Sequence, residues 1–130
     1  MYASQGANAY AQVSLQSSVS GASPHQLISM LFDGAHNAIL QAKIYADKGN
    51  IAKRGKMISR AINIIDNGLR ASLDHEKGLE IAAELEQLYD YMSRTLLLAN
   101  LRNEPEQFLH VDKLLMRLSD TWKEIEFHTR

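Results

Sequence analysis

The sequence predicts an all-α protein, an antiparallel up-down-up-down four-helix bundle with an N-terminal segment lying on it. In four stretches, apolar residues recur at the three- and four-residue spacing of a helix face, whereas no alternation of period two persists. Gly and Pro stand mainly at the joints between these stretches. Helices of about 20 to 25 residues, each about 30 to 37 Å long, bury such stripes against one another when short loops join them.

Length and composition narrow the classes of function. The 130 residues fit one domain, and a net charge of -1 gives no reason to expect nucleic acid or an anionic membrane as partner. The chain has no cysteine, which excludes disulfides and thiolate nucleophiles. Its start lacks the features of a signal peptide and no apolar run reaches membrane-spanning length, so we expect a cytoplasmic protein without membrane insertion.

The N-terminal segment differs from the rest of the chain. Asp33 is the first residue with a full charge, and residues 1–22 are rich in Ser, Ala, Gln and Gly. We therefore divide the chain into a flexible or capping segment, 1–22, and a bundle domain, 23–130. The few sizeable apolar groups of the segment include Tyr2, Tyr10 and Val13, which predict a strip that lies on an apolar surface and can detach.

The first two helices have clear boundaries. Ser23, Pro24 and Gln26 form a capping-box start, and Gly49-Asn50 ends the first helix before Ile51 opens the second. The expected core stripes are Leu27, Ile28, Leu31, Ala35, Ala38, Ile39 and Ala42, followed by Ile58, Ile62, Ile65, Leu69 and Leu73.

The last two helices follow a break at residues 74–78, which we interpret as a loop. The third helix ends around residues 100–103, and Asn103 starts the fourth, with Pro105 in its first turn and Glu106 at the capping-box position. Their stripes are Ala82, Leu85, Tyr89, Met92 and Leu96, then Phe108, Val111, Leu115, Leu118, Trp122 and Ile125.

Apolar residues outside these stripes predict a partner-binding surface. The second helix carries a second ridge about 100° from its main stripe, and the third helix adds two large side chains on another flank. These candidate residues are Met57, Ala61, Ile64, Gly68, Ala71, Tyr91 and Leu98. A large exposed apolar patch commonly marks a partner site, and small residues let a partner helix approach closely. The alternative is a broad core contact, because a bundle helix touches two neighbours.

No catalytic constellation is recognisable. A di-iron bundle needs two Glu-x-x-His pairs, and the nearest match is one Asp33-x-x-His36. Phosphate-binding glycine loops and nucleophile elbows are also missing. We expect a non-enzyme with no cofactor, metal site or catalytic residue. A ferritin-like metal carrier and a self-associating structural bundle remain the alternatives.

Several segments, in their order and spacing, resemble the flagellar secretion chaperone (FliS) family. The resemblance covers essentially the whole chain. It rests on Tyr10, Ser23-Pro24, the run 27–35, Gly49-Asn50, the run 61–65, Leu73-Asp74, the run 88–92, Leu114-Leu115 and Trp122.

The resemblance implies a cytosolic export chaperone for flagellin. Such a protein binds the C-terminal segment of flagellin one to one, prevents premature polymerisation and assists delivery to the flagellar type III export apparatus. In the family the N-terminal segment can cover part of the client groove and be displaced. Export apparatus components and an anti-sigma factor are further implied partners, and the protein without client is expected to be a monomer or weak dimer. A self-associating bundle without a flagellin client stays open.

Overall fold

A computed structural model describes residues 21–129 of the chain, with side chains described through residue 125. The expectations for Tyr2, Tyr10 and Val13 lie outside these residues. The elements are α2 (Pro24–Asp47), α3 (Ile51–Ile64) with its continuations η1 (Ile65–Leu69) and η2 (Arg70–Ser72), α4 (His75–Arg102) and α5 (Glu106–Thr129).

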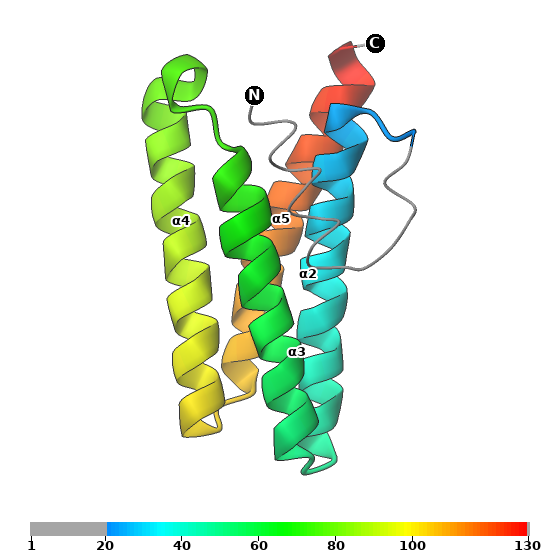
Figure 1. The fold of residues 1–130 in the computed structure, drawn as a ribbon, viewed down its shortest axis with the longest axis vertical. Helices are drawn as coiled ribbons and strands as arrows, with labels where there is room; N and C mark the ends of the chain where they lie inside the picture. The colour runs from blue at the N-terminus through cyan, green and yellow to red at the C-terminus, as the bar shows by residue number, and fades with distance from the viewer. Residues whose placement is uncertain (1–20, 130) are drawn as a thin grey trace.

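The helices form an antiparallel up-down-up-down bundle, so the predicted all-α four-helix bundle is confirmed (Figure 1). Helices α2 and α4 occupy opposite corners, and each packs against the α3 segment and against α5. No helix within residues 21–129 is long and apolar enough to cross a membrane.

The start of α2 is as predicted. The Ser23 side chain accepts from the Gln26 backbone N–H, and the Gln26 side chain accepts from the Ser23 backbone N–H. At the other end Gly49 has a φ of +71°, which glycine adopts without strain. Asn50 then caps α3 by accepting from the Lys53 backbone N–H.

The bundle core comes mainly from the predicted stripes. Leu31, Ile39, Ile58, Met92 and Phe108 are all fully or almost fully buried. Ile28, Ile62, Leu73, Leu118 and Trp122 are partly buried against this core.

The second ridge of α3 is not an exposed surface, and that expectation is wrong for three of its members. Ala61 and Ile64 have 0% exposure and Gly68 is buried. A Cβ on Gly68 would lie only 2.8 Å from Leu31 Cδ2, so the ridge packs against α2. The α3 segment contacts both α2 and α4, which widens its buried arc, as the broad-core alternative stated. Met57 is half-buried and Ala71 is exposed.

The expected loop at residues 74–78 is mostly a helical turn. Asp74 caps it by accepting from the backbone N–H groups of Glu76 and Lys77. The regular helix is interrupted one residue later than the sequence indicated, at Leu79, with φ 45° and ψ -118°.

Asn103 ends α4 and does not begin α5, which is a third correction. Its backbone is left-handed, with a φ of 54°, and α5 begins at Glu106. The Asn103 side chain accepts from Arg54 Nη1, while Arg54 also donates to the side chain and the carbonyl of Asn100. The nearly buried Arg54 therefore ties the start of α3 to the end of α4.

Candidate partner-binding groove

An apolar groove of about 490 Å³ opens at the end of the bundle where α2 and α4 begin and α5 ends. Residues of α2, the α3 continuation, α4 and α5 line it. They are Ile28, Phe32, Leu69, Ser72, Leu73, Asp74, Lys77, Gly78, Ile81, Ala82, Leu85, Tyr89, Leu118, Thr121, Trp122 and Ile125. Most of these side chains are apolar, so the groove suits apolar groups of a partner.

The lining of the groove combines buried and exposed apolar residues. Phe32, Leu69 and Tyr89 are buried beneath it. Gly78 and Ala82 contribute little side-chain volume, and the diagonal helices α2 and α4 do not pack directly on each other. Ile81 and Ile125 line the groove but remain largely exposed. Apolar side chains thus remain exposed at the rim of the groove.

Trp122 is held in place by His25 across the α2–α5 interface. Their rings stack with centroids 4.4 Å apart and an interplanar angle of 6°. The Trp122 indole N–H donates to the His25 carbonyl at 3.0 Å, and His25 Nε2 donates to the Trp122 carbonyl at 2.7 Å. These reciprocal bonds fix one wall of the groove.

Burial raises the pKa of Tyr89 well above its ordinary value of 10.0, because desolvation disfavours the phenolate. The neutral phenol of Tyr89 therefore persists to higher pH than that of an exposed tyrosine. Asp74, Lys77 and Thr121 supply polar groups among the lining residues.

A second apolar surface, the α4 patch, consists of Tyr91, Leu97, Leu98 and Leu101. All four are exposed, with 42% for Tyr91 and 43% for Leu98. Tyr91 leans toward α5, where its hydroxyl hydrogen-bonds His110 Nε2 at 2.9 Å. The predicted exposure of Tyr91 and Leu98 is confirmed, and their role in binding stays a prediction.

None of the seven candidate residues from α3 and α4 lines the groove. The groove is built instead from the ends of stripes that the sequence assigned to the core, such as Leu73, Leu118 and Trp122. The topology could have indicated the groove. In an up-down bundle these stripe ends meet at one end of the molecule, together with Ile81, an apolar residue outside the core stripe of its helix.

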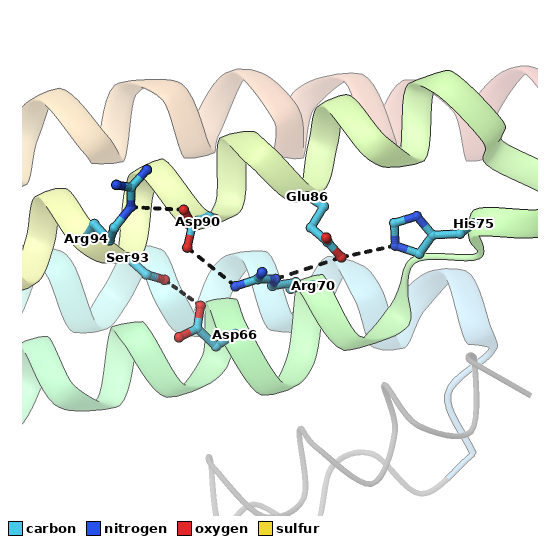
Figure 2. A network of polar contacts seen from close by, with 7 residues as sticks. All are labelled: Asp66, Arg70, His75, Glu86, Asp90, Ser93 and Arg94. Atoms are coloured by element: carbon cyan, nitrogen blue, oxygen red, sulfur yellow. Dashed lines mark hydrogen bonds and ion pairs between the residues drawn. The ribbon is translucent and has the colours of Figure 1, made fainter.

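A polar network joins the α3 continuation to α4 beside the groove (Figure 2). Its central residue, Arg70, lies 3.9 Å from Glu86 and 3.6 Å from Asp90. Further contacts are His75–Glu86 at 3.1 Å, Arg94–Asp90 at 2.9 Å and Ser93–Asp66 at 2.7 Å. Such partly exposed pairs each contribute at most about 1 kcal/mol, so the network orients the two segments more than it stabilises them.

The Asp33-x-x-His36 motif does not form half of a metal site. Asp33 pairs with Lys123 at 2.9 Å, and His36 pairs with Asp112 at 2.7 Å. Among the residues with described side chains, no group of three or more His, Asp or Glu could hold a metal ion.

An all-α bundle with an open apolar groove and an exposed apolar patch is typical of proteins that bind another polypeptide. The model of the family described as "Flagellar protein FliS" matches residues 6–129. The "Flagellar secretion chaperone FliS" of Salmonella typhimurium is 54% identical over 125 residues, covering 96% of this chain and 93% of the relative. The protein of the same name from Escherichia coli is 46% identical, covering 95% and 91%.

A more distant relative, the "Flagellar secretion chaperone FliSB" of Pseudomonas aeruginosa, is 38% identical over 122 residues, covering 94% of this chain and 96% of the relative. The chain belongs to the FliS family of flagellar secretion chaperones. This is a family of chaperones and not of enzymes, and it implies a client protein as partner.

Proposed function

We propose that this protein is a cytosolic export chaperone whose client is the C-terminal segment of flagellin, bound one to one. The chaperone would prevent premature flagellin polymerisation and assist delivery to the flagellar type III export apparatus. The observation that carries the proposal is the open apolar groove of about 490 Å³ in a member of a secretion chaperone family.

The shape and chemistry of the groove suit one face of an amphipathic helix. Helix-in-groove recognition places apolar side chains spaced three and four residues apart into an apolar channel. The α4 patch adds exposed apolar residues on a further stretch of the helix that forms a wall of the groove. A client segment covered in this way cannot use its apolar face to pair with another flagellin.

The remaining candidate residues belong to the same proposal. Tyr2, Tyr10 and Val13 compete with the client for apolar surface, so removing residues 1–18 changes client affinity and leaves the fold intact. Met57 and Ala71 contribute on the α3 side. Contacts with export apparatus components and an anti-sigma factor complete the proposed partners.

Two isoleucines with equal exposure at opposite ends of the bundle provide the test. Ile81 lines the groove and Ile51 begins α3 at the far end, and both are 67% exposed. Calorimetry with a flagellin C-terminal peptide should give one-to-one binding that Ile81→Asp weakens at least about tenfold, as expected for loss of a buried apolar contact. Ile51→Asp should bind like the wild type. Equal binding by both variants would contradict the groove as client site.

The exposed α4 patch favours one second candidate, a bundle that self-associates. Sizing of the protein alone and with the peptide separates the two functions. A chaperone forms a one-to-one complex with the peptide, whereas a purely structural bundle self-associates and ignores it. Loss of a dimer in Leu98→Asp, without any peptide binding by the wild type, would favour the structural bundle.

A further inference from the structure

Leu79 is a strained residue in an exposed position. Its φ of 45° and ψ of -118° lie where a side chain is crowded by the backbone, a region that glycine favours. The Leu79 side chain is 70% exposed, so its own packing does not compensate the strain. The strain must be balanced by contacts that neighbouring residues make.

Two geometric features of the structure depend on this break. His75 Nε2 lies 3.1 Å from Glu86 Oε1, and the two side chains point toward each other in Figure 2. On a straight helix, residues eleven apart would be separated by about 16 Å along the axis. A Cβ on Gly78 would lie 2.8 Å from Ala82 Cβ, whereas Cβ atoms four residues apart on a regular helix are about 5–6 Å apart. The break therefore folds the turn 75–78 back along α4.

The folded-back turn is part of the groove wall. Lys77 and Gly78 line the groove on this side, next to Leu73 and Asp74. If α4 were straight through Leu79, the turn would continue along the helix axis and leave Ile81 and Ala82 as the border. The kink thus decides whether this wall is present.

We propose that the turn 75–78 is a hinged wall that closes on the occupant of the groove when α4 is kinked and releases it when α4 straightens at Leu79. The identity of the occupant rests on the proposed function, but the hinge does not. Backbone strain at Leu79 favours the straight form. The His75–Glu86 contact and the occupant favour the kinked form, because only this form presents Lys77 and Gly78 to the groove.

Cross-linking tests the hinge on the full chain, which contains no cysteine. In the double variant His75→Cys, Glu86→Cys, a short, reducible bis-thiosulfonate should bridge the two thiols. The matched control is Glu84→Cys, Thr95→Cys, which has the same eleven-residue spacing on the regular part of α4. Its thiols should cross-link at least about tenfold more slowly, because a regular helix holds them about 16 Å apart. Equal rates for the two pairs would show that α4 is straight and would overturn the proposal.

Two substitutions at the hinge should move the cross-linking rate in opposite directions. Leu79→Gly relieves the strain of the positive φ and should raise the rate of the 75/86 pair. Gly78→Ala adds a methyl that would crowd Ala82 in the kinked form, and should lower the rate by at least about fivefold, as expected for an overpacked contact. A shift in the same direction for both variants would contradict a hinge between these two forms.

The release rate of a bound peptide tests whether the hinged wall closes the groove. A bound flagellin C-terminal peptide should dissociate at least about tenfold more slowly from the cross-linked 75/86 protein, and reduction should restore the rate. Unchanged release from the cross-linked protein would overturn the gating role.

The dye 8-anilino-1-naphthalenesulfonate, which binds exposed apolar surface, is measured in parallel. If the peptide does not bind at all, the proposed function fails, and the rate of dye release still tests the hinged wall. Slower dye release after cross-linking supports the hinged wall, and unchanged dye release overturns it.

Discussion

The second ridge of α3 and the outer face of α4 carry similar apolar patterns, yet one is buried and the other is exposed. Ile64 on α3 has 0% exposure, whereas Tyr91 on α4 is 42% exposed. The α3 segment lies between α2 and α4 and packs most closely on α2, so both of its apolar faces find partners. On α4, Tyr91 contacts His110 of α5 but remains exposed, as does Leu98. Apolar surplus alone therefore does not mark a binding surface, because the closeness of the neighbouring helices decides whether it is covered.

The largest expected effect is that of Ile64→Asp. A carboxylate at a fully buried position with no partner should cost more than about 4 kcal/mol and unfold the protein. Circular dichroism and thermal melting measure the loss. Ala71→Asp, at the exposed end of the same ridge, is the matched control and should melt within a few degrees of the wild type. A folded Ile64→Asp protein would contradict the burial of this ridge.

Gly68→Ala should be destabilising even though alanine is the better helix former. The new methyl would stand 2.8 Å from Leu31 Cδ2, and Leu31 is itself fully buried and cannot move freely. We expect a loss of about 1–2 kcal/mol in chemical denaturation, typical of an overpacked core. Gly55→Ala is the control, because its new Cβ would meet only Asn100 Nδ2 at 3.6 Å. Equal stability of the two variants would show that α2 and η1 pack less tightly.

Tyr91→Asp should change binding and not stability. The side chain is largely exposed, and its hydroxyl contacts His110 on the surface. The melting temperature should stay within about 3 °C of the wild type, since an exposed substitution costs about 0.5 kcal/mol or less. Affinity for the flagellin peptide should fall about tenfold, which corresponds to about 1.4 kcal/mol. Unchanged affinity would remove the α4 patch from the proposed client surface.

The smallest effect is expected for Tyr89→Phe, and only at alkaline pH. Burial raises the pKa of Tyr89 in the folded protein, so above pH 10 the unfolded chain releases a proton that the folded protein keeps. Stability contributed by the neutral phenol is complete below pH 10 and declines at higher pH, by up to about 1.4 kcal/mol per pH unit.

Urea denaturation of both proteins at pH 8 and pH 11 measures this linkage. The Phe variant lacks the group that titrates, so its stability should fall by about 1 kcal/mol less than that of the wild type over this interval. An identical decline for both proteins would show that Tyr89 ionises as readily in the folded protein as in the unfolded chain.

The local signals of the sequence predicted the fold well. The capping box of Ser23 and Gln26 and the glycine at position 49 act through contacts within a few residues, and the structure contains them as expected. The boundary at Asn103 was wrong because its side chain is used by Arg54, a residue 49 positions away in the chain. Distant contacts of this kind leave no periodic signal.

The candidate site was predicted only in part. Tyr91 and Leu98 are exposed as expected, whereas Ala61, Ile64 and Gly68 lie in the core. The groove was missed because its lining residues, such as Leu73 and Trp122, have the same helical spacing as core residues.

The sequence by itself determined the number, order and inner faces of the helices, because helical periodicity and capping are properties of neighbouring residues. Only the tertiary structure decided which apolar faces are covered. That outcome depends on how closely α2 packs on the α3 segment and on the break at Leu79, which together leave one end of the bundle open. The same apolar spacing yields core in one place and an exposed surface in another, because burial depends on how neighbouring helices pack against one another.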